Sequence, residues 1–259
     1  MKKLLLNLTL LLAGVVSAQE GLPTPSYAAH FTGHIAGGRM GTAAAPQSTN
    51  ATLVADRHNN LNDAISNVSG SSYITLPGAA NSMTSNFSIS FWYKKTGTFQ
   101  GNLNHRPFFT APNTATIGYG EGTFLGLNND GTKFVFGNVI NTPITGSQSK
   151  EVNIPANVNV EEWNYYTLIR ENATTLALYV NNVFLDNKEN ITFSSINGNG
   201  NIYLGGYSLG SSFASCQGHF DNLKIYHNPL SETQRTALYN WEMGDSYRGE
   251  IKVLLVNLS

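Results

Sequence analysis

The chain has 259 residues, of which 15 are basic, 16 are acidic and only 12% are charged. This near balance of charge excludes a basic surface of the kind that binds nucleic acid. The length is enough for one large domain with a sizeable core, and the single cysteine, Cys216, excludes an internal disulfide bond. We expect this cysteine to be buried or half-buried and chemically inert.

Residues 1–18 are typical of a secretory signal peptide. Two lysines precede an apolar block from Leu4 to Val16, and small residues follow up to Ala18. The block is too short to span a bilayer as a helix. We therefore expect export to a secreted or cell-surface location, with no transmembrane segment after cleavage. Removal of Lys2 and Lys3 leaves 13 basic residues against 16 acidic ones, a net charge of −3.

Residues 19–26 contain two prolines and are expected to form an extended leader. From 27 to 242, short apolar alternations are separated by Gly, Asn, Pro and Ser, a pattern that predicts one all-β domain. Residues 243–259 form a C-terminal tail, whose apolar run at 251–256 is either a closing strand or an attachment segment.

The clearest predicted strand is 87–94, because an apolar or aromatic residue occupies every second position from Phe87 to Tyr93. Two turns connect neighbouring strands, at 128–131 and at Asn181-Asn182, where asparagine tolerates a positive φ. Further strands are predicted at 73–76, 124–127, 133–136, 176–180 and 183–185.

The last long strand, 220–226, places an acid among apolar residues. Asp221 shares strand parity with Leu223 and Ile225, so its carboxylate is predicted on a buried face, where it needs hydrogen bonds or a cation. Beyond this strand, Ser231 and Gln234 have the spacing of a capping box. They predict one short helix that ends near residue 239.

Several short elements follow one another in a fixed order. They are Ala28–Gly33, Gly70–Pro77, Phe87–Trp92, Trp163–Leu168, Leu176–Asn181, Phe220–Tyr226 and Pro229–Ser231. In this order and spacing they resemble the laminin G-like branch of the concanavalin A-like lectin and glucanase superfamily, in the versions found in secreted bacterial proteins. The resemblance implies an all-β fold, a jelly-roll sandwich of two antiparallel sheets with one short C-terminal helix.

Domains of this superfamily often hold one calcium ion where the opening strand, the Gly-Ser loop and the last long strand meet. The resemblance therefore implies a structural Ca²⁺ with Asp221 as side-chain ligand, and with backbone carbonyls near His30 and Gly70 as further donors. Calcium suits such a site because it takes about 6 to 8 oxygen ligands with flexible geometry. The alternative is that Asp221 only accepts backbone or hydroxyl hydrogen bonds.

Sugar-cleaving members of the superfamily use two carboxylates about 5 Å apart, usually in an arrangement like Glu-x-Asp-x-x-Glu. No such run occurs here. The acidic clusters, Glu161-Glu162 and Glu242 with Asp245, lie off the alternating strands and are expected to be solvated. We therefore predict no enzymatic activity, and a glycoside hydrolase is an alternative that rests on superfamily membership alone.

Sugars bind by stacking on aromatic rings whose polar neighbours donate and accept hydrogen bonds. The tryptophans Trp92, Trp163 and Trp241 are expected to be structural. The candidate ligand contacts are instead loop aromatics and polar residues near them: Phe99, Asn104, Arg106, Tyr119, Tyr207 and Phe213.

Together these features predict a secreted, non-catalytic recognition or adhesion module that binds carbohydrate. Its expected partner is a glycan or a cell-surface protein. A structural protein-adhesion domain and the glycoside hydrolase are the alternatives.

Overall fold

The computed structural model describes residues 22–31, 38–40, 51–67, 73–83, 86–101, 105–112, 122–139, 148–193, 200–209 and 212–244. Pro25–Pro229 form one compact unit that contains every described strand. Helix α2 (Glu232–Met243) belongs to a second unit and is treated by itself. The predicted signal peptide and the apolar run at 251–256 lie outside the described residues.

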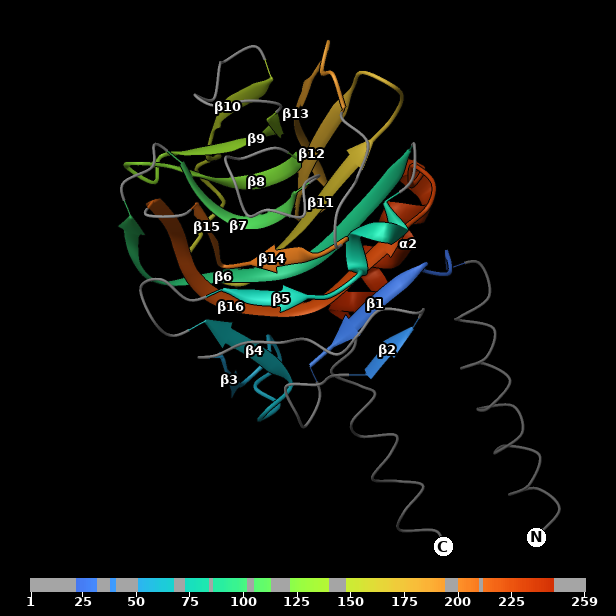
Figure 1. Cartoon of the computed structure of the whole chain (residues 1–259). Helices are drawn as coiled ribbons and strands as arrows, with labels where there is room; N and C mark the ends of the chain where they lie inside the picture. The colour runs from blue at the N-terminus through green and yellow to red at the C-terminus, as the bar shows by residue number, and fades with distance from the viewer. Residues whose placement is uncertain are drawn as a thin grey trace, which may run out of the picture. The chain divides into compact units, whose positions relative to one another are not determined.

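The compact unit is built from two antiparallel sheets (Figure 1). The larger has the order β13-β12-β11-β6-β16-β1-β2, with β15 and β4 also paired to β16 and β3 paired to β4. Its strands are β1 (Tyr27–His30), β2 (Gly38–Met40), β3 (Ala51–Val54), β4 (Ala64–Asn67), β6 (Phe87–Gly101), β11 (Asn164–Arg170), β12 (Leu176–Val180), β13 (Val183–Lys188), β15 (Gly206–Leu209) and β16 (Ser212–Tyr226).

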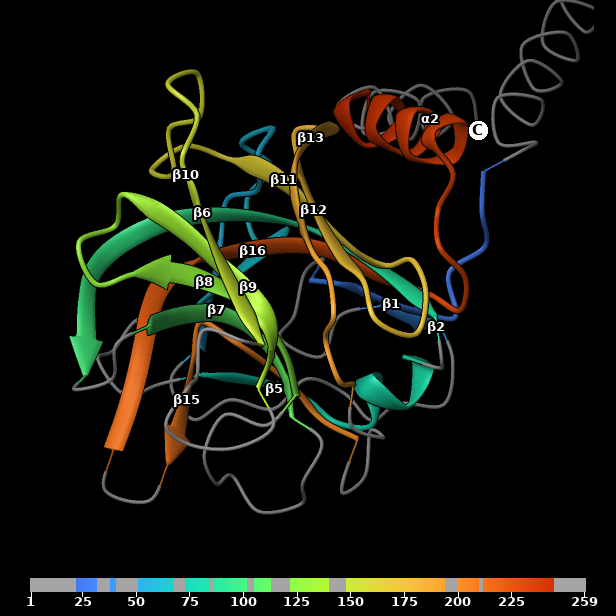
Figure 2. The ribbon, with the colours of Figure 1, turned by 90° about the horizontal axis from the view of Figure 1, so that it is seen from above.

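The smaller sheet has six strands in the order β10-β9-β8-β7-β14-β5. They are β5 (Ile74–Leu76), β7 (His105–Pro112), β8 (Gly122–Asn128), β9 (Lys133–Val139), β10 (Ser149–Asn153) and β14 (Ile202–Leu204), with a short 3-10 helix, η1 (Ala79–Ser82), following β5. Seen from above, the curved strands β7, β8 and β9 lie in one layer and β6 and β16 in another (Figure 2). This arrangement confirms the predicted sandwich.

The core lies between the two sheets, and aromatic rings form much of it. Phe91 and Tyr93 on β6 stack on Phe109 and Phe108 on β7, with ring centroids 5.6 and 4.3 Å apart. All four rings are fully buried. Each such side chain contributes roughly 1.5–3 kcal/mol of transfer free energy. The alternation predicted for 87–94 therefore identified the core face of β6 correctly.

The two long strands, β6 and β16, pair along most of their length, with register shifts between Cys216 and Gly218 and between Asp221 and Lys224. The sequence predicted only one half of each strand, 87–94 and 220–226. The other halves are rich in Ser, Thr and Gly, which give no apolar alternation. They are ordered as strands because each pairs with the other.

The second register shift corrects the predicted orientation of Asp221. Asn222 has a φ of 48°, which adds a bulge between Asp221 and Leu223. Phe220 and Leu223 consequently both lie in the core. Asp221 lies opposite Trp92, on the outer face of the sheet, although it is still buried there with 3% of its surface exposed. Strand parity failed because the bulge interrupts the period of two.

Helix α2 begins with the predicted capping box, in which the Ser231 side chain accepts from the Gln234 amide and the Gln234 side chain accepts from the Ser231 amide. The helix runs to Met243, beyond the predicted end. Trp241 and Glu242 are therefore helical, and Glu242 is fully buried rather than solvated as predicted. Within the described residues, no helix has the length and apolar character needed to span a bilayer.

Candidate functional site

The outer face of the larger sheet, turned away from the smaller sheet, holds a group of polar and aromatic side chains. The β6 residues that alternate with the core face point there, and Trp92 and Lys94 are two of them. In the neighbouring strands, Asp221 and His219 lie opposite Trp92 and Lys94, and Tyr165 of β11 also lies opposite Trp92. Side chains from three strands therefore share this face.

At one end of this face lies what we term the tryptophan surface, formed by Trp163, His219, Lys94 and Glu162. Trp163 immediately precedes β11 and is half-buried. Its ring centroid lies 6.1 Å from that of His219, with the ring planes at 51°. Lys94 Nζ lies 3.7 Å from Glu162 Oε2. The surface thus combines an accessible aromatic ring with an imidazole and an exposed ion pair.

Burial, and next the nearby positive charge of Lys94, lower the pKa of His219 from its ordinary value. The imidazole is therefore neutral at neutral pH. A neutral imidazole has one N–H donor and one ring-nitrogen acceptor, so it matches the hydroxyl groups of a neutral ligand.

A buried ion pair lies next to the tryptophan surface on the same face. The Arg57 guanidinium donates to Asp221 Oδ2, and the two side chains are only 5% and 4% exposed. Arg57 Cζ lies 4.8 Å from the centroid of the Trp92 ring. Trp92 in turn contacts Tyr165 at 5.1 Å between ring centroids.

The structure brings two of the three predicted metal-site residues to the same edge. His30, at the end of β1, forms a hydrogen bond through Nδ1 to Oδ1 of Asn222, the neighbour of Asp221. Gly70 lies outside the described residues. No group of three or more His, Cys, Asp or Glu side chains suited to a metal occurs in the described part of the chain.

The residues described around Asp221 do not fit a calcium ion. One carboxylate oxygen is already bound by a guanidinium, which places a positive charge where the ion would need negative or neutral oxygen donors. Calcium binding stays a prediction from the resemblance. In the structure, Arg57 binds the carboxylate that the ion would need.

The predicted ligand residues Phe99, Tyr207 and Phe213 lie in strands β6, β15 and β16, not in the loops that the sequence suggested. Their backbones are close together, because Phe99 pairs with Cys216, and Tyr207 and Ser208 pair with Ala214 and Phe213. The loop assignment failed because the second halves of β6 and β16 were not recognised as strands.

Arg106 was predicted as a candidate ligand contact but is buried, with 9% of its surface exposed. It lies on β7 opposite the core residue Leu127, and its Nη1 donates to the carbonyl of His105 at 3.3 Å. An arginine in this position is part of the fold rather than an open ligand contact. The other two predicted contacts, Asn104 and Tyr119, lie outside the described residues.

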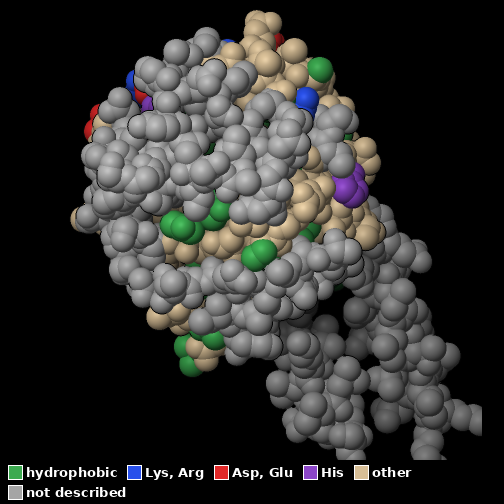
Figure 3. Space-filling model, in the orientation of Figure 1, with side chains coloured by type: hydrophobic (Ala, Val, Ile, Leu, Met, Phe, Trp, Pro, Cys, Tyr) green, Lys and Arg blue, Asp and Glu red, His purple; other side chains and the backbone are tan. Residues whose placement is uncertain are grey.

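The outer face of the smaller sheet is aromatic but largely covered. Phe124 and Tyr203 lie on this face and are 6% and 4% exposed. Tyr73 is half-buried and meets Tyr203 edge to face at 5.2 Å between ring centroids. In Figure 3, a few hydrophobic side chains show at the surface where Figure 1 draws β5 and β14. Among the Phe and Tyr rings described on or beside this sheet, Tyr73 is thus the one that is half-buried rather than buried.

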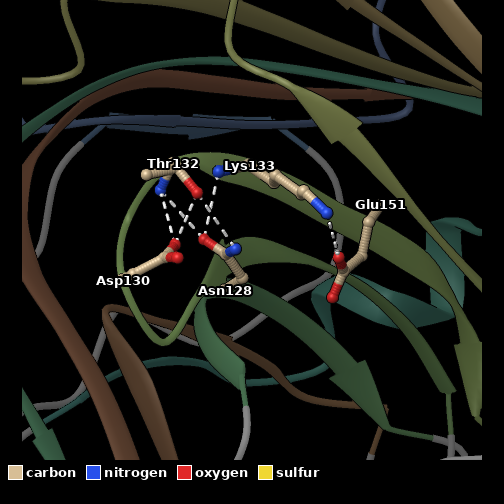
Figure 4. A network of polar contacts seen from close by, with 5 residues as sticks. All are labelled: Asn128, Asp130, Thr132, Lys133 and Glu151. Atoms are coloured by element: carbon tan, nitrogen blue, oxygen red, sulfur yellow. Dashed lines mark hydrogen bonds and ion pairs between the residues drawn. The ribbon is translucent and has the colours of Figure 1, made fainter.

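The β8–β9 turn contains a polar network that serves the turn itself (Figure 4). Asn128 Oδ1 accepts from the backbone amides of Thr132 and Lys133, both at 3.0 Å. Asp130 accepts from the hydroxyl and the amide of Thr132, and these two bonds lower its pKa. Lys133 pairs with Glu151 on β10 at 3.0 Å. The network confirms the predicted hairpin.

Sequence reasoning treated Trp163 as structural and did not consider Arg57 or His219 as site residues. A signal for the outer face was present, because Trp92 and Lys94 alternate with the core residues of 87–94. The pairing of Arg57 with Asp221 has no local signal, since 164 positions separate them.

These features define a sandwich of two antiparallel sheets, with polar and aromatic side chains on the outer face of the larger sheet. A laminin G-type family model, described as the concanavalin A-like lectin/glucanases superfamily, matches residues 68–234. The chain belongs to this superfamily, as the sequence elements predicted. A search of curated proteins found no match.

Among solved structures, the chain is similar to the binding domain of botulinum neurotoxin serotype D, with 12% identity and a TM-score of 0.59 over 85% of this chain and 52% of that one. It is also similar to the serotype G binding domain, with 15% identity and a TM-score of 0.59 over 85% of this chain and 52% of that one. A third similar structure is the binding domain of botulinum neurotoxin DC in complex with SialylT, with 14% identity and a TM-score of 0.51 over 77% of this chain and 46% of that one. The chain spans about half the length of these structures, and the likeness concerns the fold alone.

Proposed function

We propose that the chain is a non-catalytic carbohydrate-recognition module of an exported protein. The observation on which the proposal depends is the tryptophan surface, where the half-buried ring of Trp163 lies beside the neutral imidazole of His219. The binding domains with a similar fold support a binding role, and one of them is described in complex with SialylT.

The tryptophan surface has the chemistry that a sugar ring needs. The indole face of Trp163 offers a stacking partner for the C–H face of a pyranose. The imidazole of His219 and the Lys94–Glu162 pair supply donors and acceptors for the surrounding hydroxyl groups. Because both signs of charge are present, neutral and acidic sugars are both suitable.

The arrangement of acids argues against a glycoside hydrolase. Glu161 and Glu162, the acidic cluster found in the sequence, pair with Lys95 and Lys94 at 3.1 and 3.7 Å. Glu151 likewise pairs with Lys133. These pairs suit a binding surface better than a hydrolytic site.

The test is a glycan array, including sialylated glycans, probed with the intact protein and with Trp163→Ala. We expect at least one glycan hit that is lost in Trp163→Ala while the circular dichroism spectrum and melting temperature stay unchanged. Tyr73→Ala is the matched control, because it removes a half-buried ring from the other sheet. It should retain binding.

Other outcomes would contradict either the proposed location of the site or carbohydrate binding itself. Loss of binding in Tyr73→Ala but not in Trp163→Ala would move the ligand to the smaller sheet. Loss in Tyr207→Ala alone would favour the candidate ligand contacts predicted from the sequence, of which Tyr207 is one. An array without any hit would reject carbohydrate recognition.

A protein-adhesion role is the second candidate, and an exposed hairpin tip favours it. Val183 and Phe184, which follow the Asn181-Asn182 turn, are 58% and 51% exposed. The two are adjacent in the sequence, and a contiguous exposed apolar patch is a feature of surfaces on which a partner docks. Under this alternative, Phe184→Ala weakens retention at the cell surface and Trp163→Ala does not.

A further inference from the structure

The loop that precedes β4 holds itself in place through one carboxylate. Asp56 Oδ1 accepts from the backbone amides of His58 and Asn60, both at 2.8 Å, and Asp56 Oδ2 accepts from Asn60 Nδ2 at 3.0 Å. The Asn59 amide also donates to the Asp56 carbonyl, and Asn59 has a φ of 64°. Both carboxylate oxygens of Asp56 are therefore used within the loop.

This fixed loop presents Arg57 to the bulge in β16. The guanidinium pairs with Asp221, and its Cζ lies 4.8 Å from the ring centroid of Trp92. Both charged side chains are about 95% buried, at 5% and 4% exposure. A carboxylate buried to this degree needs a cation or several donors close to it. Arg57 provides the cation from within the chain.

Neighbouring polar groups at the same edge also contact each other, through a hydrogen bond. Asn222, which makes the bulge through its positive φ, shares a hydrogen bond with His30 at the end of β1. At this edge, side-chain contacts thus join β1 to β16 and the 56–60 loop to β16.

We infer that Arg57 takes the place of the calcium ion that the family resemblance implies at Asp221, so that the fold is stable without calcium. The ion pair joins the 56–60 loop to β16 and holds Trp92 on the outer face. The inference concerns the stability of the domain and is independent of the proposed sugar binding.

The experiment measures thermal unfolding of the intact protein in EDTA and in excess Ca²⁺. A ligand that binds only the folded state raises the melting temperature. We expect the same melting temperature in both buffers, and no heat of calcium binding in a calorimetric titration. A calcium-dependent rise that disappears in Asp221→Asn would overturn the inference.

A double-mutant cycle tests the role of the ion pair directly. Arg57→Ala and Asp221→Ala should each lower the melting temperature, and the double variant should be much less destabilised than the sum of the two, since each single change leaves one buried charge unpaired. Arg57→Lys keeps the charge and should retain part of the stability. Additive losses would show that the two residues do not act together. If Arg57→Ala does not fold, the calcium titration of the unmodified protein still decides.

Discussion

Gly218 on β16 lies directly against the ring of Tyr93 on β6: a Cβ at Gly218 would stand 2.2 Å from Tyr93 Cε2 and 2.5 Å from the Lys94 carbonyl oxygen. Tyr93 is fully buried, and its hydroxyl lies within hydrogen-bonding distance of Cys216 and Gln217. The ring therefore has little freedom to move aside. The two long strands can approach at this point because residue 218 has no side chain.

Gly218→Ala should destabilise the protein by about 1–3 kcal/mol, the usual cost of forcing an extra carbon into a packed core. Urea denaturation measures the loss. Gly244→Ala is the matched control, because the nearest atom to a Cβ there is 3.5 Å away. Equal stability of Gly218→Ala and the unmodified protein would show that Tyr93 can shift.

The bulge at Asn222 gives a second prediction. Asn222→Ala should lose about 1–2 kcal/mol for a left-handed backbone conformation, and also the hydrogen bond to His30. Asn222→Gly relieves the backbone cost but not the lost hydrogen bond, so its stability in urea should be intermediate. If the glycine variant is as unstable as the alanine variant, the backbone conformation is not the cause.

The sequence predicted those parts of the fold that depend on neighbouring residues. The alternation from Phe87 to Tyr93 and the Asn181-Asn182 turn are local patterns, and both were confirmed, with φ values of 50° and 64° at the two asparagines. Asp221 was correctly predicted to be buried. The predicted face of the sheet was wrong for Asp221, because Asn222 in a left-handed conformation changes which side chains of β16 point into the core. The Asp-Asn pair inside the strand was the available hint.

The candidate site was less predictable, because it is assembled by pairing between distant strands. Trp163 meets His219 only when β11, β6 and β16 lie side by side. Arg57 meets Asp221 through the same sheet, by way of β4. The pattern of neighbouring residues contains no information about such pairs. A family resemblance gives the order of the strands in the sheet, but it does not show which side chains meet across them.

His219 predicts a pH dependence of stability. Burial lowers its pKa in the folded state below the ordinary 6.5, so the unfolded chain binds a proton first as the pH falls. The contribution of His219 to stability is therefore present above pH 6.5 and decreases between 6.5 and the lower folded pKa. Urea denaturation from pH 5 to pH 8, compared with His219→Gln, isolates this effect. A variant with the same slope would assign the pH dependence to other groups.

The Cys216 thiol should be unreactive in the folded protein. It is fully buried, and its Sγ lies 3.0 Å from the Tyr93 hydroxyl. Burial raises the pKa of the thiol to about 12, so very little thiolate is present at pH 8. Ellman's reagent should label the native protein only slowly, through transient opening, and should react fully in guanidinium chloride. The rate of labelling under native conditions then measures opening of the strands around Tyr93, and Gly218→Ala should increase it. Immediate reaction of the native protein would show that Cys216 is accessible and that β6 and β16 are not closed at this point.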